Sequence, residues 1–320
     1  MSVEVKQISA TQPVSPQKVI VVAGVTASGK TAYAKSLAGR LLDEGKQPVF
    51  INVDSMQVYT ELEVGNNKGA LDRNQQGDWS YTDFPKIPVK LVNIVSVYSP
   101  EASSFNVSAF QKLARQEIGK AFADGKVPIL VGGSGLYLAS VICDYEFLQN
   151  TALTNKESTE RQPANVDELQ RQLTDLGFDL NSLNNSDRAN PRRLQNLFRK
   201  MQSGTEIASS QLEFIYNIEL HYLHASFPAH KQVLRKRVAE MLPGLITECE
   251  QLLAHYGKVD GIPAKLAAAS GYKQVLEALA NKMDPTTPTS FVSLVDLVCN
   301  SHYQLARRQD KWFKKYLLRP

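Results

Sequence analysis

Cysteine is scarce in this chain of 320 residues, which has only Cys143, Cys249 and Cys299. The three are scattered, so no pair has the spacing of metal ligands, and the odd number argues against a disulfide framework. A reducing compartment, the cytoplasm, is therefore the expected location. The sequence also lacks any apolar run of the roughly 18 residues that a membrane span needs, so we expect no membrane partner.

Net charge is low as well, +4 at pH 7, in a chain that is 43% hydrophobic and 21% charged. These values are ordinary for a globular protein, and they do not by themselves indicate a nucleic-acid partner. Residues 1–17 are polar and include Pro13 and Pro16. They lack both the apolar stretch of a secretion signal and the arginines of a transit peptide. We therefore expect a disordered tail over residues 1–17.

Short apolar runs alternate with helical patterns in the first half of the chain. The runs at 18–24, 48–53, 89–95 and 127–131 predict buried strands, and 30–42 and 107–123 have helical spacing. Such alternation predicts an α/β fold, a parallel sheet with helices on both faces. Residues 145–212 are polar without a strand-like run, which predicts a small helical insertion. The core would then comprise 18–144 and 213–320, the latter ending in helical stretches.

Residues 24–31, GVTASGKT, match the phosphate-loop pattern G-x-x-x-x-G-K-[ST] in full. Two glycines, Gly24 and Gly29, let the backbone turn tightly, so that consecutive N–H groups point at phosphate oxygens. Lys30 adds a point charge, and the Thr31 hydroxyl can ligate Mg²⁺. With a predicted strand before it and a helix after it, the segment predicts a phosphate site.

A second strand ending in aspartate, which usually completes a triphosphate site, is missing. The run 127–131 is followed by Gly132 and Gly133, and the strand-terminal carboxylate is instead Asp54, after 48–53. Because parallel strands end at one shared crevice, we expect Asp54 near the phosphate loop. It could serve there as a general base or a partner to a metal; a helix cap or turn aspartate is the ordinary alternative.

Several further segments follow the phosphate loop in a distinctive order. They are DSMQVY (54–59), VGNNK (64–68), LVGGSGLY (130–137), NPRRL (190–194), RVAEML (237–242), SGYKQ (270–274) and QLARRQDKWF (304–313). In this order the segments resemble the tRNA dimethylallyltransferases, or isopentenyl transferases, over nearly the whole chain. The resemblance implies the P-loop NTPase-like version of the α/β fold, with the insertion 145–212 binding tRNA.

The resemblance also implies a reaction. The phosphate loop would hold dimethylallyl pyrophosphate instead of ATP, through Gly24, Thr26, Ala27, Ser28, Gly29, Lys30 and Thr31 together with Arg237. The catalytic residues would be Asp54, Thr31 and Arg237, with Asp54 accepting the proton of the adenine N6 amine and Thr31 binding Mg²⁺ or pyrophosphate. The acceptor would be the adenosine 3′ of the tRNA anticodon, flipped out of its stack.

A tRNA-binding set follows from the same resemblance and from local charge. It comprises Ser55, Met56, Gln57, Ser134, Arg192, Arg193, Gly271, Tyr272, Lys273, Arg307, Arg308, Gln309 and Trp312. Basic residues that alternate with aromatic ones near the C-terminus suit phosphates and unpaired bases. A solvated basic face with aromatic rings in the core is the ordinary alternative. We expect a monomer that binds the anticodon stem-loop.

The chain departs from the family pattern at four places. Histidines before the third strand are replaced by VKL (89–91), and an acidic or amide residue by Ala109. A Thr-Arg pair is replaced by His302 and Tyr303, and R-A-L-E by QNLF (195–198). The phosphate loop, Asp54 and Arg237 are retained, so we predict a divergent but active member.

Three other functions fit part of the sequence. A small-molecule kinase would explain the phosphate loop but not the later segments. An adenylate isopentenyltransferase, which makes cytokinins from AMP or ATP, is favoured slightly by the spellings of 56–59 and 67–68. A non-catalytic RNA-binding derivative is suggested by the four departures and opposed by the retained Asp54, Lys30 and Arg237.

Overall fold

The computed structural model describes residues 2–8, 17–145, 165–183, 185–202, 213–285 and 287–318. The chain divides into two compact units, Met1–Tyr145 with Glu213–Pro320, and Glu146–Leu212. The expected insertion was 145–212, and the expected core was 18–144 with 213–320; the larger unit differs from that core in including the residues before Lys18. The larger unit is an α/β structure, and the described part of the smaller unit is helical.

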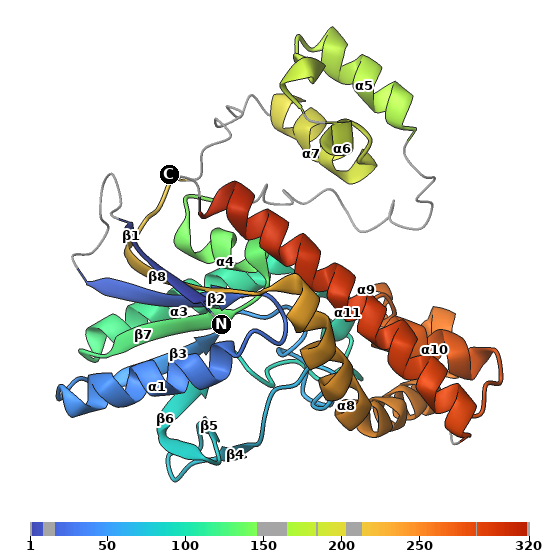
Figure 1. Ribbon diagram of the computed structural model, residues 1–320. Coiled ribbons are helices and arrows are strands. Elements are labelled where there is room, and N and C mark those ends of the chain that lie inside the picture. The colour runs from blue at the N-terminus through green and yellow to red at the C-terminus, as the bar shows by residue number, and fades with distance from the viewer. Residues whose placement is uncertain are drawn as a thin grey trace. The chain divides into compact units, whose positions relative to one another are not determined.

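A sheet of eight strands forms the centre of the larger unit, in the order β1-β8-β2-β7-β3-β6-β5-β4. Its central strands are parallel: β8 (Asn217–His224), β2 (Lys18–Gly24), β7 (Val127–Gly132), β3 (Pro48–Asn52) and β6 (Phe84–Lys90). Antiparallel strands complete the two edges, β1 (Ser2–Ile8) on one side and β5 (Trp79–Tyr81) with β4 (Leu71–Arg73) on the other. Figure 1 shows β2, β7 and β3 running side by side through the core.

The expectation of a disordered tail is wrong over residues 2–8, which form β1. This strand pairs with β8 from Ser2 opposite His224 to Ile8 opposite Ile218. The reason is a period-two pattern, VEVKQI, which is a strand signal that the polar composition obscured. Residues 9–16 lie outside the described part of the chain.

The strand expected at 89–95 is also displaced, because β6 ends at Lys90. Leu91 and Asn93 have φ angles of 60° and 54°. This left-handed backbone conformation is incompatible with an extended strand. Leu91, Val92 and Val95 are therefore buried in a loop and not in a strand of the sheet, and Ile94 is exposed.

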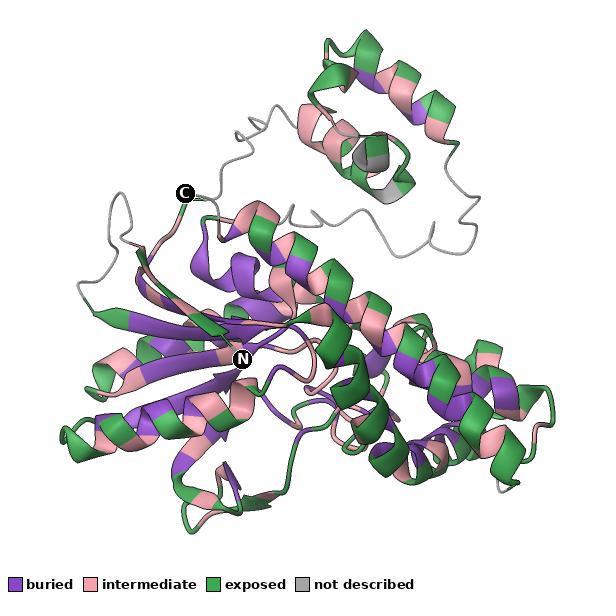
Figure 2. Ribbon diagram, in the orientation of Figure 1, coloured by how far each residue is buried: buried purple, intermediate pink, exposed green. Residues whose placement is uncertain are grey.

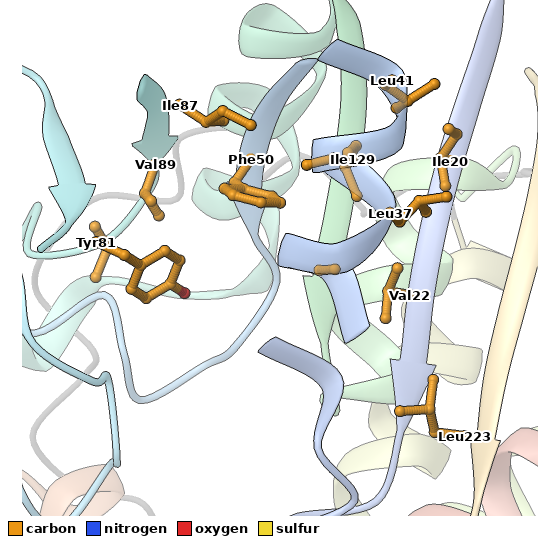
Figure 3. Close-up of a cluster of buried hydrophobic side chains, with 13 residues drawn as sticks. Ile20, Val22, Leu37, Leu41, Phe50, Tyr81, Ile87, Val89, Ile129 and Leu223 are labelled. Carbon is orange, nitrogen blue, oxygen red and sulfur yellow. The ribbon is translucent and has the colours of Figure 1, made fainter. Parts of the chain in front are cut away.

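Helices cover both faces of the sheet. On one face, α1 (Lys30–Asp43) packs Leu37 and Leu41 against Ile20, Phe50 and Ile129 (Figure 3). Alternate residues of the same strands point to the opposite face, where α3 (Val107–Ala123) contacts β7 and β3. The expected P-loop NTPase-like α/β fold is confirmed.

The remaining helices of the larger unit follow the sheet ends. They are α2 (Glu101–Ser104), α4 (Gly135–Ile142), α8 (Phe227–Tyr256), α9 (Ala264–Ala267), α10 (Tyr272–Ala280) and α11 (Pro288–Tyr316), with a 3₁₀ turn at Val259–Gly261. The long helices α8 and α11 pack against each other, and α11 also reaches β2 and α4. Figure 2 shows buried positions recurring along α8 and α11, each with an exposed opposite side. These two helices therefore bring residues from the last third of the chain to the sheet.

The smaller unit has its own apolar core. Its elements are α5 (Val166–Asp175), a 3₁₀ turn (Leu180–Ser182), α6 (Asn185–Arg188) and α7 (Pro191–Gln202). Leu169, Leu173 and Leu194 are its buried residues. Of the expected tRNA-binding pair, Arg193 is exposed on α7, and the side chain of Arg192 lies outside the described residues. No helix in the described parts of the chain has the length and apolar character required to cross a membrane.

Candidate active site

The phosphate loop (residues 24–31) joins the end of β2 to the start of α1. Ala27 and Gly29 adopt left-handed conformations with φ of 58° and 79°, and the Ser28 N–H donates to the Val25 carbonyl at 3.2 Å. A Cβ atom on Gly24 would lie 2.8 Å from the Ser28 hydroxyl and 2.9 Å from the Leu223 carbonyl oxygen. The loop is therefore wound as tightly as its glycines predicted.

Two polar groups of this loop lack a competing side-chain partner. The Ser28 hydroxyl is buried, 1% exposed, and has no hydrogen-bond partner within the described structure. The Lys30 ammonium folds back and donates to the Val25 carbonyl at 2.7 Å. A bound anion would supply hydrogen-bond acceptors to both groups. For the Ser28 hydroxyl this would remove the free-energy cost of a buried donor without a partner.

Asp54 stands two residues beyond β3, at the same sheet edge as the phosphate loop. The neighbouring backbone is tied to β7 by the Val53 N–H to the Val131 carbonyl, at 2.8 Å. It is tied to the following turn by the Ser55 N–H to the Ser134 hydroxyl, at 3.1 Å. The Asp54 carboxylate itself accepts the Met56 N–H at 2.9 Å, which fixes its orientation.

Asp54, Lys30 and Arg237 are close enough for their charges to influence one another. The pKa of Lys30 is lowered to about 8, because burial and, to a smaller extent, the Arg237 guanidinium outweigh the opposing effect of the Asp54 carboxylate. Burial also lowers the pKa of Arg237, again opposed by Asp54. The Arg237 Nε is buried without a hydrogen-bond partner in the described structure. Lys30 at the start of α1, Asp54 after β3 and Arg237 of α8 are therefore near enough to interact electrostatically.

The lowered pKa of Lys30 predicts a pH dependence for anion binding. Below pH 8 the free protein already carries the ammonium, whereas above pH 8 ligand binding must take up a proton. We expect the affinity for dimethylallyl pyrophosphate to fall about tenfold per pH unit above pH 8, until the pKa of the liganded state is reached. Calorimetric titration from pH 6.5 to about 9.5 measures this.

Lys30→Met is the control for the ionisation of the ligand itself, because this variant keeps only the ligand's contribution. Lys265→Met is a second control, since burial lowers the pKa of Lys265 to about 8 as well. The decline above pH 8 should persist in Lys265→Met and disappear in Lys30→Met. An unchanged profile in Lys30→Met would contradict the assignment.

Lys265 of α9 is a site residue that the sequence did not reveal. Its Nζ donates to the Tyr137 hydroxyl at 2.9 Å and lies 5.3 Å from the Tyr59 ring centroid and 5.8 Å from that of Phe105. The Asp54 carboxylate acts on its pKa too, opposing the effect of burial. Lys265 is therefore a third cation near Asp54, set among aromatic rings. A lone lysine before SGYKQ carried no signal of this position.

Four of the residues expected to contact tRNA belong to the segments after β3 and β7, and all four are partly exposed: Ser55, Met56, Gln57 and Ser134. Ser55 and Ser134 bond to each other as described above. Gln57 donates its carboxamide to the Asn66 carbonyl at 3.0 Å. Of these residues, Met56 bonds to the carboxylate through its N–H and Ser134 bonds to the neighbouring Ser55. Contact with RNA is an expectation that belongs to the proposed function.

Tyr272 is placed differently from the expectation. Its side chain is fully buried, and its hydroxyl donates to Glu248 at 2.6 Å. Glu248 also accepts the N–H groups of Val64 and Gly65, at 2.7 and 3.1 Å. The expected RNA contact of Tyr272 is therefore wrong: it joins the GYK and VGNNK segments inside the core. Gly271 beside it is buried, and Lys273 is exposed on α10.

Tyr272→Phe is expected to destabilise the fold. The change removes a hydrogen bond to a buried carboxylate, which contributes about 1.5–3 kcal/mol to the free energy of unfolding. Denaturant unfolding measures the effect. Tyr303→Phe is a matched control, because the Tyr303 hydroxyl makes no hydrogen bond within the described residues, and it should change stability by less than about 0.5 kcal/mol. Equal effects of the two variants would contradict the role of Glu248.

The expected residues of α11 divide between two sides of the helix. Arg307 and Arg308 are exposed. Trp312 faces inward, since a Cβ atom on Gly135 would lie 2.2 Å from its indole ring. Gln309 also faces inward, and its carboxamide reaches the phosphate loop at Thr26. His230 of α8, to which the sequence assigned no role, reaches the same residue.

One of the four departures from the family pattern lies near this site. His302 is buried, and burial together with the Arg237 guanidinium lowers its pKa to about 4. It is therefore neutral at physiological pH and adds no charge to the anion-binding space. Its Nε2 lies 3.3 Å from the Ser270 carbonyl oxygen, which accepts its proton in one tautomer.

A magnesium ion fits the donor groups at this site. No cluster of three His, Cys, Asp or Glu residues able to hold a metal occurs in the described parts of the chain. Mg²⁺ does not require one, because it retains waters and takes oxygen ligands from one or two side chains and the phosphates. The Thr31 hydroxyl, at the first turn of α1, is such an oxygen, and it lies beside the Tyr81 hydroxyl.

Fold and site together define the class: a P-loop α/β protein in which an aspartate follows β3, at the same edge of the parallel sheet as the phosphate loop. Comparisons with known proteins carry the identification further. The model of the family described as IPP transferase matches residues 57–316. The chain therefore belongs to the IPP transferase family.

Individual relatives are similar to this chain over most of their length. The chain is 30% identical to the tRNA dimethylallyltransferase of an Exiguobacterium species, covering 92% of this chain and 87% of the relative. It is 31% identical to that of Anoxybacillus flavithermus, covering 94% and 88%.

Solved structures agree as well. The tRNA isopentenylpyrophosphate transferase of Staphylococcus epidermidis superposes with a TM-score of 0.58 at 25% identity, over 93% of this chain and 90% of that one. A eukaryotic dimethylallyltransferase acting on tRNA shares the fold, with a TM-score of 0.66 at 22% identity, over 93% and 70% of the two chains.

Proposed function

We propose that this protein transfers a dimethylallyl group from dimethylallyl pyrophosphate to N6 of the adenosine 3′ of the anticodon in tRNA. The observation that carries the proposal is the meeting of Asp54, Lys30 and Arg237 around the phosphate loop. Membership of the IPP transferase family, with relatives named tRNA dimethylallyltransferase, supports the same reaction. All three groups come from one chain, and we propose that the protein acts as a monomer.

The reaction forms one bond and breaks one. The adenine N6 attacks C1 of the donor, the C1–O bond breaks, and the electron pair leaves with the pyrophosphate. Asp54 accepts the proton that N6 loses as the new C–N bond makes the amine acidic. The carboxylate suits this role because the Met56 N–H fixes its orientation and cations surround it.

Negative charge grows on the leaving pyrophosphate during this step. The loop N–H groups, the Ser28 hydroxyl, Lys30 and Arg237 are positioned to stabilise that charge before the reaction begins, which is the effective form of electrostatic catalysis. Thr31 would hold magnesium together with the phosphates, and the ion would supply further charge neutralisation. The phosphate loop therefore works here on a leaving group and not on a transferred phosphoryl group.

The adenine must leave its stack to reach Asp54. Ser55, Met56, Gln57 and Ser134 are partly exposed next to the carboxylate, and they would contact the flipped base and its neighbours. Lys273, Arg307 and Arg308 are exposed and basic, which suits the phosphates of the anticodon stem-loop. The helical unit with Arg192 and Arg193 would add further contacts to the tRNA.

A direct assay tests the proposal. Purified protein is incubated with labelled dimethylallyl pyrophosphate, Mg²⁺ and either an anticodon stem-loop or AMP. Label in the stem-loop is expected. Label only in AMP would support cytokinin synthesis, and label in neither, beside an active relative, would support a non-catalytic RNA-binding protein. ATP turnover without the prenyl donor would support a kinase.

A further inference from the structure

Thr26, at the top of the phosphate loop, is held on both sides by side chains from distant helices. Its N–H donates to the Gln309 carboxamide oxygen at 2.8 Å, from α11. Its carbonyl oxygen lies 2.9 Å from Nε2 of His230, from α8, which donates its proton there. Ala27, the next residue, has the strained φ of 58°. The two helices thus fix the peptide groups that lead into the left-handed part of the loop.

The other end of the Gln309 carboxamide bonds to the turn after β7. Its Nε2 donates to the Gly133 carbonyl at 3.0 Å, and a Cβ atom on Gly133 would lie 2.9 Å from the same nitrogen. Ser134, the next residue, accepts the Ser55 N–H beside Asp54. Gln309 therefore bridges the phosphate loop to the turn that positions the backbone of the catalytic carboxylate.

The part of helix α11 that carries Gln309 is held in place by contacts with β8. One residue further along, the Asp310 carboxylate accepts the Tyr222 hydroxyl of β8 at 3.0 Å in a buried position. Phe313 is fully buried and packs its ring against Tyr222. These contacts leave little rotational freedom for the inward side of the helix, so the carboxamide is preorganised and not merely able to reach the loop.

We propose that Gln309 is a positioning residue for the pyrophosphate of the donor, and not a contact to RNA. The inference rests on the proposed function, since it assigns the loop to a diphosphate. Gln309 accepts the Thr26 N–H, so that this N–H is not available to the anion. The same hydrogen bond fixes the loop backbone, so that the other N–H groups of the loop keep the positions that anion binding requires. His230 supports the same loop from the opposite side of Thr26.

Two substitutions at Gln309 separate this role from an RNA contact. Gln309→Leu removes both hydrogen bonds, whereas Gln309→Glu keeps an acceptor for the Thr26 N–H but cannot donate to Gly133 and adds a negative charge. The matched control is Gln304→Leu, at an exposed position of the same helix. Three quantities are measured: the calorimetric Kd for inorganic pyrophosphate with Mg²⁺, the KM for the prenyl donor, and the KM for the anticodon stem-loop.

Loss of one neutral hydrogen bond to the loop corresponds to about a tenfold weaker affinity. We expect Gln309→Leu to raise the Kd for pyrophosphate and the KM for the donor by about this factor, and Gln309→Glu to raise both further, because its charge repels the anion. The stem-loop KM should stay unchanged in both variants, and Gln304→Leu should behave as the unmodified protein does.

Several results would overturn the inference. One is an increased stem-loop KM with unchanged donor KM, and another is an unchanged Kd for pyrophosphate in both Gln309 variants. If Gln309→Leu does not fold, as judged by circular dichroism, Gln309→Glu decides alone. The calorimetric readout requires no prenyl transfer. An inactive protein that loses pyrophosphate affinity in the variants would therefore refute the proposed function and leave the positioning role intact.

Discussion

Asp54→Asn is expected to lower kcat by about 10²- to 10⁴-fold, the usual contribution of a general base. The amide oxygen of asparagine can still accept the Met56 N–H that the carboxylate accepts at 2.9 Å, so the local turn is kept. The amide cannot take up the proton that N6 releases. Single-turnover transfer of labelled donor to the stem-loop measures the loss directly.

The same substitution should not weaken the binding of the donor. The Asp54 carboxylate raises the pKa values of Lys30 and Arg237, which means that it attracts both cations. Removing its negative charge leaves those cations free for the pyrophosphate, so Kd should be unchanged or lower at a pH where Lys30 stays protonated. Asp78→Asn, at a surface ion pair with Lys90, is the matched control and should retain full kcat. Full activity in Asp54→Asn would exclude the base assignment.

The sequence predicted the part of the site that is local in the chain. The phosphate loop has a fixed spacing, and its glycines, Lys30 and Thr31 follow directly from that spacing. Asp54 could be placed near it because β2, β7 and β3 are parallel and therefore end at one edge. Both predictions needed only the strand pattern and the rule for where parallel strands end.

The rest of the site depends on helices α8 to α11 and could not be placed by pattern. Gln309 and Arg308 are neighbours in the same basic segment of the sequence. Gln309 nevertheless bonds to Thr26, whereas Arg308 is exposed. Which side of a helix faces inward is decided by packing, here through Asp310 and Phe313. Lys265 likewise comes near enough to Asp54 to interact electrostatically, although it lies far along the chain on the short helix α9.

Tyr272 shows the same limit from the other direction. Its motif suggested a functional surface, whereas its hydroxyl completes a buried network on Glu248 with the loop at 64–65. A short motif shared by a family indicates that a position matters, but buried polar networks are retained for folding as well as for function. Only the burial of the side chain distinguishes the two cases.

Arg237→Met is expected to lower kcat/KM for the donor by about 10²- to 10³-fold, the size of effect seen when one preorganised donor to a developing anion is removed. The guanidinium interacts electrostatically with Lys30 and Asp54, and its Nε is buried without a hydrogen-bond partner within the described structure. Lys236→Met, at the preceding exposed position of α8, is the matched control. Steady-state kinetics with varied donor measures the effect, and a change of less than about threefold would contradict it.

The stability of Arg237→Met tests whether the Arg237 guanidinium serves the fold or the binding of pyrophosphate. Burial lowers the pKa of Arg237, so the charged side chain is held in the ligand-free fold at a cost in free energy. Replacing it by an apolar residue of similar length should therefore leave the melting temperature of the free protein unchanged or raise it. Pyrophosphate with Mg²⁺ should raise the melting temperature of the unmodified protein, by mass action, and have little effect on Arg237→Met. A destabilised variant that still gained full stability from pyrophosphate would show that Arg237 supports the fold instead of the leaving group.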